Sequence, residues 1–188
     1  MNPNSSNVYG PDAKLDFTSV DFRGRKRWIA EVERFKQEIA GSEGKYEVDI
    51  SRHKEGAIKV VVKELADGSL KSSMGNNLQP LVMNFEIPVD YPMSPPLVWV
   101  ETPHLIGSRQ SELSFGIFHG VPCLKELKIG GWTPIFNLSS TFVFVLNALT
   151  EHTVIDKSSN KARITRKAAL DGSMQIARAH PDWISNHR

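Results

Sequence analysis

Residues 81–100 read LVMNFEIPVDYPMSPPLVWV, two apolar stretches on either side of a proline-rich segment. In the first stretch every second residue from Leu81 to Ile87 is apolar, which is the period of a strand with one buried face. The segment 88–96 holds four prolines, which exclude a helix or a central strand and favour a rigid extended turn. Residues 97–100 are apolar throughout and predict another strand directly after this turn.

The residues before this stretch predict a helix and two more strands. Residues 46–50 and 58–62 show the same alternation, and Glu55 and Gly56 between them are typical of a turn. Four apolar residues farther upstream recur at spacings of four, three and four, which predicts a helix over 24–40. They are Trp28, Val32, Phe35 and Ile39. Short connections between four consecutive strands favour an antiparallel meander covered by helices, an α+β fold.

The second half of the chain contains a long segment without periodicity. Residues 101–132 are punctuated by glycines and contain the single cysteine, Cys123, and irregular segments of this length inside a compact domain are usually functional. An amphipathic helix is predicted from the capping residues Ser139 and Ser140 to Leu149, and a basic helical stretch over 160–180. In the first half of the chain, residues 66–80, between the strands at 58–62 and 81–87, are predicted to be a turn and a polar loop.

The composition narrows the classes of function. The chain has 188 residues, 40% hydrophobic and 23% charged, and a formal charge of +2, which is typical of a globular domain and gives no electrostatic case for binding nucleic acid. Residues 1–21 are predicted to be a flexible lead-in to one domain over 22–188. The densest apolar run, residues 142–146, is far below the roughly 20 residues that cross a bilayer, and the start lacks a signal-peptide stretch. One cysteine and six scattered histidines show no metal-ligand spacing, so the sequence predicts neither a metal nor a cofactor. The single cysteine, which cannot form an internal disulfide, predicts a reduced, cytoplasmic setting.

Two motifs give the chain a resemblance to the ubiquitin-conjugating (UBC-like) enzymes. Residues 88–102, PVDYPMSPPLVWVET, resemble the proline-rich segment that leads into the last strand of that family. Residues 120–134, GVPCLKELKIGGWTP, resemble its catalytic segment, with a glycine before the Cys-Leu pair and Trp-Thr-Pro beyond it. The resemblance covers residues 22–156 and implies an N-terminal helix, a four-stranded antiparallel meander, a long active-site loop and C-terminal helices.

The resemblance also implies a reaction and its partners. Cys123 would accept a ubiquitin-like protein as a thioester from an activating enzyme and pass it to a lysine amine of a target, with a ligase as a further partner. At an ordinary thiol pKa near 8.5, about 3% of the cysteine is thiolate at neutral pH, which suffices because sulfur is intrinsically nucleophilic. In the family the start of the first helix meets the activating enzyme. The corresponding basic residues here are Arg23, Arg25, Lys26 and Arg27.

The chain departs from the family before the cysteine, where FGIFHGVPC at 115–123 lacks the Asn of the usual His-Pro-Asn tripeptide. Because of this departure, the chain resembles a divergent branch of the family, similar to prokaryotic conjugating-enzyme-like proteins. A role in antiviral defence is suggested by that analogy alone. His119 and His104 are the candidates to stabilise the oxyanion in place of the Asn or to accept a proton from the attacking lysine. Asp156, 33 residues after Cys123 (156 − 123), matches the family's acidic gate if one residue is inserted.

Two other functions fit the same residues. One is a UBC-fold adaptor that binds a ubiquitin-like protein, a ligase or an activating enzyme without chemistry, and the missing Asn favours it. The other is a Cys-His hydrolase that uses His119 or His104. Each candidate residue also has a purely structural interpretation: a buried thiol, loop histidines, an exposed aspartate and solvated basic helix faces at 23–27 and 157–167.

Overall fold

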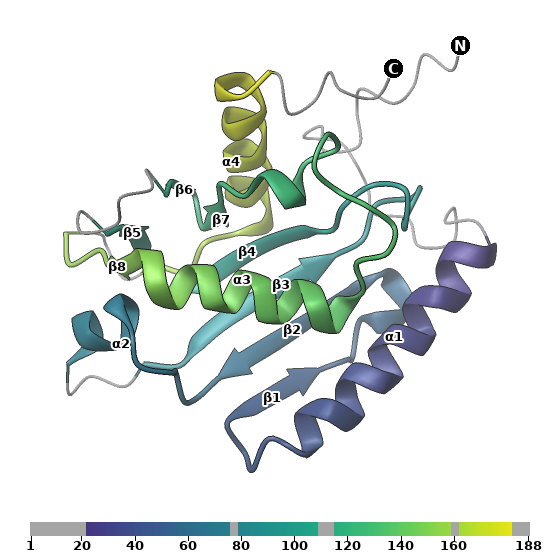
Figure 1. The fold of residues 1–188 in the computed structure, drawn as a ribbon, viewed down its shortest axis with the longest axis horizontal. Helices are drawn as coiled ribbons and strands as arrows, with labels where there is room; N and C mark the ends of the chain where they lie inside the picture. Colours follow the sequence, from purple (N-terminus) through teal and green to yellow (C-terminus); the bar gives the residue numbers. More distant parts are fainter. Residues whose placement is uncertain (1–21, 76–78, 109–114, 159–161, 182–188) are drawn as a thin grey trace.

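The computed structural model describes residues 22–75, 79–108, 115–158 and 162–181, with the backbone alone for Phe22 and Arg23. The predicted lead-in at 1–21 lies outside the described residues. The chain begins with helix α1 (Phe22–Ala40), followed by strands β1 (Tyr46–Asp49), β2 (Ala57–Val62), β3 (Leu81–Glu86) and β4 (Leu97–Thr102). These strands form one antiparallel sheet in the order β1-β2-β3-β4 (Figure 1), so the predicted α+β meander is confirmed.

Short elements and two further helices complete the described fold. They are η3 (His53–Glu55), α2 (Ser69–Met74), β5 (Leu105–Gly107), β6 (Ile117–Phe118), β7 (Val121–Pro122), η4 (Lys125–Leu127), α3 (Leu138–His152), β8 (Thr153–Ile155) and α4 (Arg166–Ala179). Strand β5 pairs with β8, and β6 pairs with β7. No helix among the described residues has both the length and the apolar character needed to cross a bilayer.

Three local predictions were wrong in detail. Residues 69–74 form helix α2 and not a loop, because Leu70 and Met74, one turn apart, are buried in the core. The segment 101–132 is not irregular throughout, since it contains β5, β6, β7 and η4. Helix α3 is capped by Asn137, whose side chain accepts from the backbone N–H of Ser140 while Ser140 Oγ accepts from the backbone N–H of Asn137.

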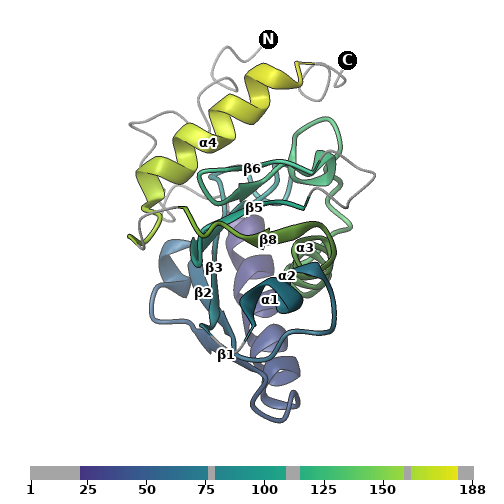
Figure 2. The same ribbon diagram turned by 90° about the vertical axis from the view of Figure 1, so that its left-hand side faces the viewer.

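The two faces of the sheet differ in polarity. The pairing register aligns one row of apolar residues across the four strands and one row of mainly polar residues beside it. The apolar row is Val48, Val60, Met83 and Val100, and the second row is Asp49, Lys59, Asn84 and Trp99. Since neighbouring residues of a strand point to opposite faces, the first row faces a core shared with α1 and α3, which lie on one side of the sheet in Figure 2.

A second, smaller core lies on the opposite face of β4. Leu97 and Trp99 of β4 pack there with Val121 of β7 and with one face of α4. This explains why residues 97–100 are apolar without alternation, because both faces of β4 are covered. Helix α4 approaches the β6–β7 hairpin closely at Gly172, where an added Cβ would lie 2.1 Å from the carbonyl oxygen of Phe118.

Candidate active site

The segment before Cys123 folds as a tight hairpin. Strands β6 and β7 are joined by His119 and Gly120, which both have positive φ angles of 47° and 79°, as a two-residue hairpin turn of the I′ type requires. The Gly120 carbonyl accepts a hydrogen bond from the backbone N–H of Val100, 2.9 Å away, which ties the hairpin to the edge of the main sheet. The hairpin therefore delivers Cys123 to a fixed position beside β4.

Cys123 directly follows β7 and is half-buried. Its backbone N–H donates to the Gly116 carbonyl at 2.9 Å, and its side chain packs against the second core. Burial raises the pKa of the Cys123 thiol, and the nearby charge of Lys128 opposes that rise without cancelling it. The thiolate fraction at neutral pH is therefore smaller than the ordinary thiol pKa predicts.

Lys128 is the residue of this site that the sequence analysis missed. It is 8% exposed, and its Nζ donates to Ser173 Oγ of α4 at 3.5 Å. Burial lowers the pKa of Lys128 to about 8, and the Cys123 charge acts in the raising direction. A lysine in a polar-looking stretch is normally exposed, so KELK at 125–128 carries no signal that its last residue is buried.

His104, His119 and Asp156 come together in one cavity of about 400 Å³. His104 hydrogen-bonds through Nε2 to the Ala162 carbonyl, and its own carbonyl accepts from the backbone N–H of Asp156. His119 is exposed at the hairpin tip, and its Nε2 lies 3.3 Å from Nε2 of Gln175 on α4. The lining of this cavity, as far as the chain is described, does not include Cys123.

The basic start of α1 divides into outward and inward residues. Lys26 is exposed and Arg25 half-buried, whereas Arg27 Nε pairs with Glu31 at 2.6 Å and its guanidinium also donates to the Phe136 carbonyl. The side chain of Arg23 lies outside the described residues. Arg27 is therefore part of the packing between α1 and the residues before α3, whereas the accessible area of Arg25 and Lys26 is compatible with a docking surface.

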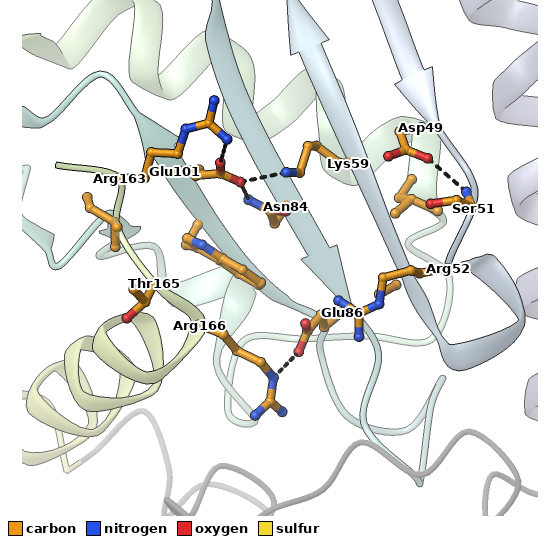
Figure 3. A pocket seen from close by; sticks show the side chains of 14 residues that line it. Asp49, Ser51, Arg52, Lys59, Asn84, Glu86, Glu101, Arg163, Thr165 and Arg166 are labelled. Atoms are coloured by element: carbon orange, nitrogen blue, oxygen red, sulfur yellow. Dashed lines mark hydrogen bonds and ion pairs between the residues drawn. The ribbon is translucent and has the colours of Figure 1, made fainter. Parts of the chain in front are cut away.

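A polar hollow of about 360 Å³ lies on the outer face of the sheet (Figure 3). Its two most buried carboxylates are each held by cations: Glu86 pairs with Arg166 Nε at 2.6 Å, and Glu101 pairs with Lys59 and Arg163 at 2.9 and 3.1 Å. The interpretation of 157–167 as a solvated basic face was thus wrong for Arg166, which is two-thirds covered, whereas Arg163 pairs with Glu101 and still keeps most of its side chain exposed. We interpret the hollow as the attachment site of the segment that leads into α4.

No three His, Cys, Asp or Glu side chains gather in a metal-binding arrangement within the described ranges. In the polar hollow Glu86 and Glu101 are engaged by Arg166, Lys59 and Arg163, and the cavity that contains the two histidines adds a single carboxylate, Asp156. The described side chains do bring a thiol, Cys123, under the electrostatic influence of a buried amine, Lys128.

Comparisons with known proteins give a likeness in structure and none in sequence. No family model matches the chain, and no curated protein matches it. Among solved structures, a protein described as a novel ubiquitin-conjugating enzyme is 15% identical, with 84% of this chain and 92% of that chain covered and a TM-score of 0.47. The α+β architecture described above rests on the coordinates of this chain itself.

Proposed function

We propose that this chain carries a ubiquitin-like protein as a thioester on Cys123 and transfers it to a lysine amine. The observation that supports the proposal is the setting of the single cysteine: it is half-buried at the end of a rigid hairpin beside the last strand of the meander, with a buried ammonium acting on it. This setting agrees with the catalytic-segment motif at 120–134.

The reaction consists of two acyl transfers. In loading, the Cys123 thiolate attacks the carbonyl carbon of the activating enzyme's thioester, a new carbon–sulfur bond forms, and the departing sulfur takes up a proton from water. In discharge, the target amine attacks the same carbon, the bond to Cys123 breaks, and the amine gives up a proton as the amide forms. His104, His119 and Asp156 are our candidates for that proton, and Arg25 and Lys26 for contact with the activating enzyme. The setting we propose is cytoplasmic.

The test of loading uses the purified chain with a cognate activating enzyme, a ubiquitin-like protein and ATP. We expect a band shift on a gel that dithiothreitol abolishes and that Cys123→Ala prevents. In Cys123→Ser the shift should persist with dithiothreitol and vanish with hydroxide, because an ester replaces the thioester. The activating enzyme's own thioester must be visible in the same lanes, so that absence of a shift on this chain contradicts the proposal.

A non-catalytic adaptor is the second candidate, and one observation favours it: burial raises the pKa of the Cys123 thiol, which disfavours its nucleophilic form. The missing Asn at 115–123 points the same way. An adaptor would bind the ubiquitin-like protein equally well with Cys123→Ala and would never form an adduct.

If the chain is instead a thioester carrier, discharge of the loaded protein to free lysine tests the three candidate proton acceptors. Alanine at His104, His119 or Asp156 should slow discharge and leave loading intact.

A further inference from the structure

Lys128 is a buried cation without a carboxylate partner in the part of the chain that the structure describes. The ion pairs found there engage Arg27, Arg52, Lys59, Lys63, Lys71, Arg163 and Arg166. Its Nζ instead lies 3.5 Å from the neutral Ser173 hydroxyl. An unpaired buried charge costs several kcal/mol, so its presence beside the candidate nucleophile calls for a functional reason.

The backbone around Lys128 is fixed on both sides. Its N–H donates to the Lys125 carbonyl at 2.9 Å, and its own carbonyl accepts from the N–H groups of Gly131 and Trp132 at 2.9 and 2.8 Å. Trp132 is itself anchored, because its indole N–H donates to the Pro92 carbonyl at 2.8 Å. The loop therefore holds the lysine stem in place, and the ammonium extends toward α4, against which Cys123 also packs.

Lys128 and Cys123 act on each other electrostatically. Burial raises the pKa of the Cys123 thiol and Lys128 lowers it, while burial lowers the pKa of Lys128 to about 8 and Cys123 raises it. These are the influences found among the described residues. The other charged residues of the adjoining elements do not contribute to either group: Lys125 and Glu126 of η4, and Arg166, Lys167, Asp171 and Arg178 of α4.

We propose that the Lys128 ammonium sets the reactivity of Cys123, favouring the thiolate before it attacks and again when it leaves at discharge. The inference rests on the proposed function. In that function Lys128 is a positioning residue, because it acts through the Cys123 thiolate. It supplies a reason for an unpaired buried charge, since the thiolate is the anion that the ammonium lacks in the resting protein. It also supplies positive charge near the reacting sulfur in a chain without the family's Asn.

The test measures the thiol itself and needs no partner protein. Because Cys123 is the single cysteine of the chain, alkylation of the full-length protein by iodoacetamide, a neutral reagent, reports on this thiol alone. We expect Lys128→Met to slow alkylation by about three- to tenfold near neutral pH, and the two rates to converge at alkaline pH, once both thiols are ionised. Lys128→Arg, which keeps the charge, should restore much of the rate.

The matched control is Lys125→Met, which removes an exposed lysine of the same loop and should leave the profile unchanged. A constant rate difference at every pH would mean altered access and would overturn the inference, as would identical profiles for wild type and Lys128→Met. A reciprocal measurement follows the Lys128 side chain by NMR: Cys123→Ala should lower its pKa. Failure of thioester loading with a normal Lys128 effect would contradict the proposed function alone.

Discussion

At the scale of single residues, this protein buries charges in two ways. Glu86, 2% exposed, has Arg166 as its partner, whereas Lys128, 8% exposed, has a serine hydroxyl and a thiol as neighbours. A partnered carboxylate keeps its charge at moderate cost, but an unpartnered ammonium lowers the stability of the fold. The pKa of Lys128, lowered to about 8 by burial, expresses that cost.

This cost predicts a stability that depends on pH. Between about pH 8 and the ordinary lysine value of 10.5, the unfolded chain binds more protons at Lys128 than the folded one, so the free energy of unfolding rises with pH in that window. We expect Lys128→Met to stabilise the fold by about 3 kcal/mol at pH 7. The gain should shrink above pH 8 and vanish near 10.5 in denaturant titrations. A gain independent of pH would indicate packing and not charge.

At the scale of elements, α4 is attached to the sheet by a buried ion pair as well as by apolar packing. Arg166, its first residue, reaches Glu86 of β3, and Arg163 just before it reaches Glu101 of β4. Burial raises the pKa of Glu101, but hydrogen bonds from Lys59 and Asn84 and the neighbouring cations outweigh this and leave it lowered. The stability from Glu101 is therefore present above its ordinary pKa and lost as pH falls through the folded value.

The Arg166–Glu86 pair predicts an asymmetry between two variants. Arg166→Met leaves Glu86 fully buried without this partner and should cost about 3 kcal/mol or more, whereas Glu86→Gln leaves a guanidinium that is 33% exposed and should cost less. Denaturant titrations give both values, and hydrogen exchange should show lost protection in α4. The control is Lys167→Met, an exposed neighbour, which should change stability by under about 0.5 kcal/mol. Equal costs for the two variants would contradict the assignment.

At the scale of the whole molecule, Glu31 connects three distant segments. Its carboxylate pairs with Arg27 on α1, accepts from the Tyr91 hydroxyl in the proline-rich segment at 2.6 Å, and accepts from the Leu138 N–H at the start of α3 at 2.9 Å. Burial and Glu31 together raise the pKa of Tyr91, so the phenol stays protonated and donates. Helices α1 and α3 and the proline-rich turn are thus held to one another by the side chain of Glu31.

Removing that carboxylate should loosen the whole fold. We expect Glu31→Ala to lower the free energy of unfolding by about 3 kcal/mol, because Arg27, Tyr91 and the start of α3 lose an acceptor together. Chemical denaturation checks this, with Glu33→Ala as the control, since Glu33 is exposed on the same helix. A loss no larger than that of the control would show that the three contacts contribute little.

Much of this architecture was predictable from local periodicity. The alternation at 81–87 and the spacing of Trp28, Val32 and Phe35 predicted β3 and α1, because a strand repeats every two residues and a helix about every 3.6. The motif around Cys123 is also a local signal, because residues close together in the sequence define it, and it marked Cys123 as the candidate nucleophile. The roles of His104, His119 and Asp156 stay predictions.

Burial and partnership of charged residues were decided by the tertiary structure alone. Nothing in the sequence distinguishes Lys128, buried beside Cys123, from the exposed Lys125 three positions earlier, or Arg166 from the exposed Lys167. Whether such a side chain is solvated depends on which elements pack over it, and here those elements are α4 and β3, far away along the chain. The sequence by itself determined the order of the main helices and strands and marked Cys123 as the candidate nucleophile. The packing of α4 onto the sheet decided the electrostatic setting of that thiol, because this packing buries Lys128.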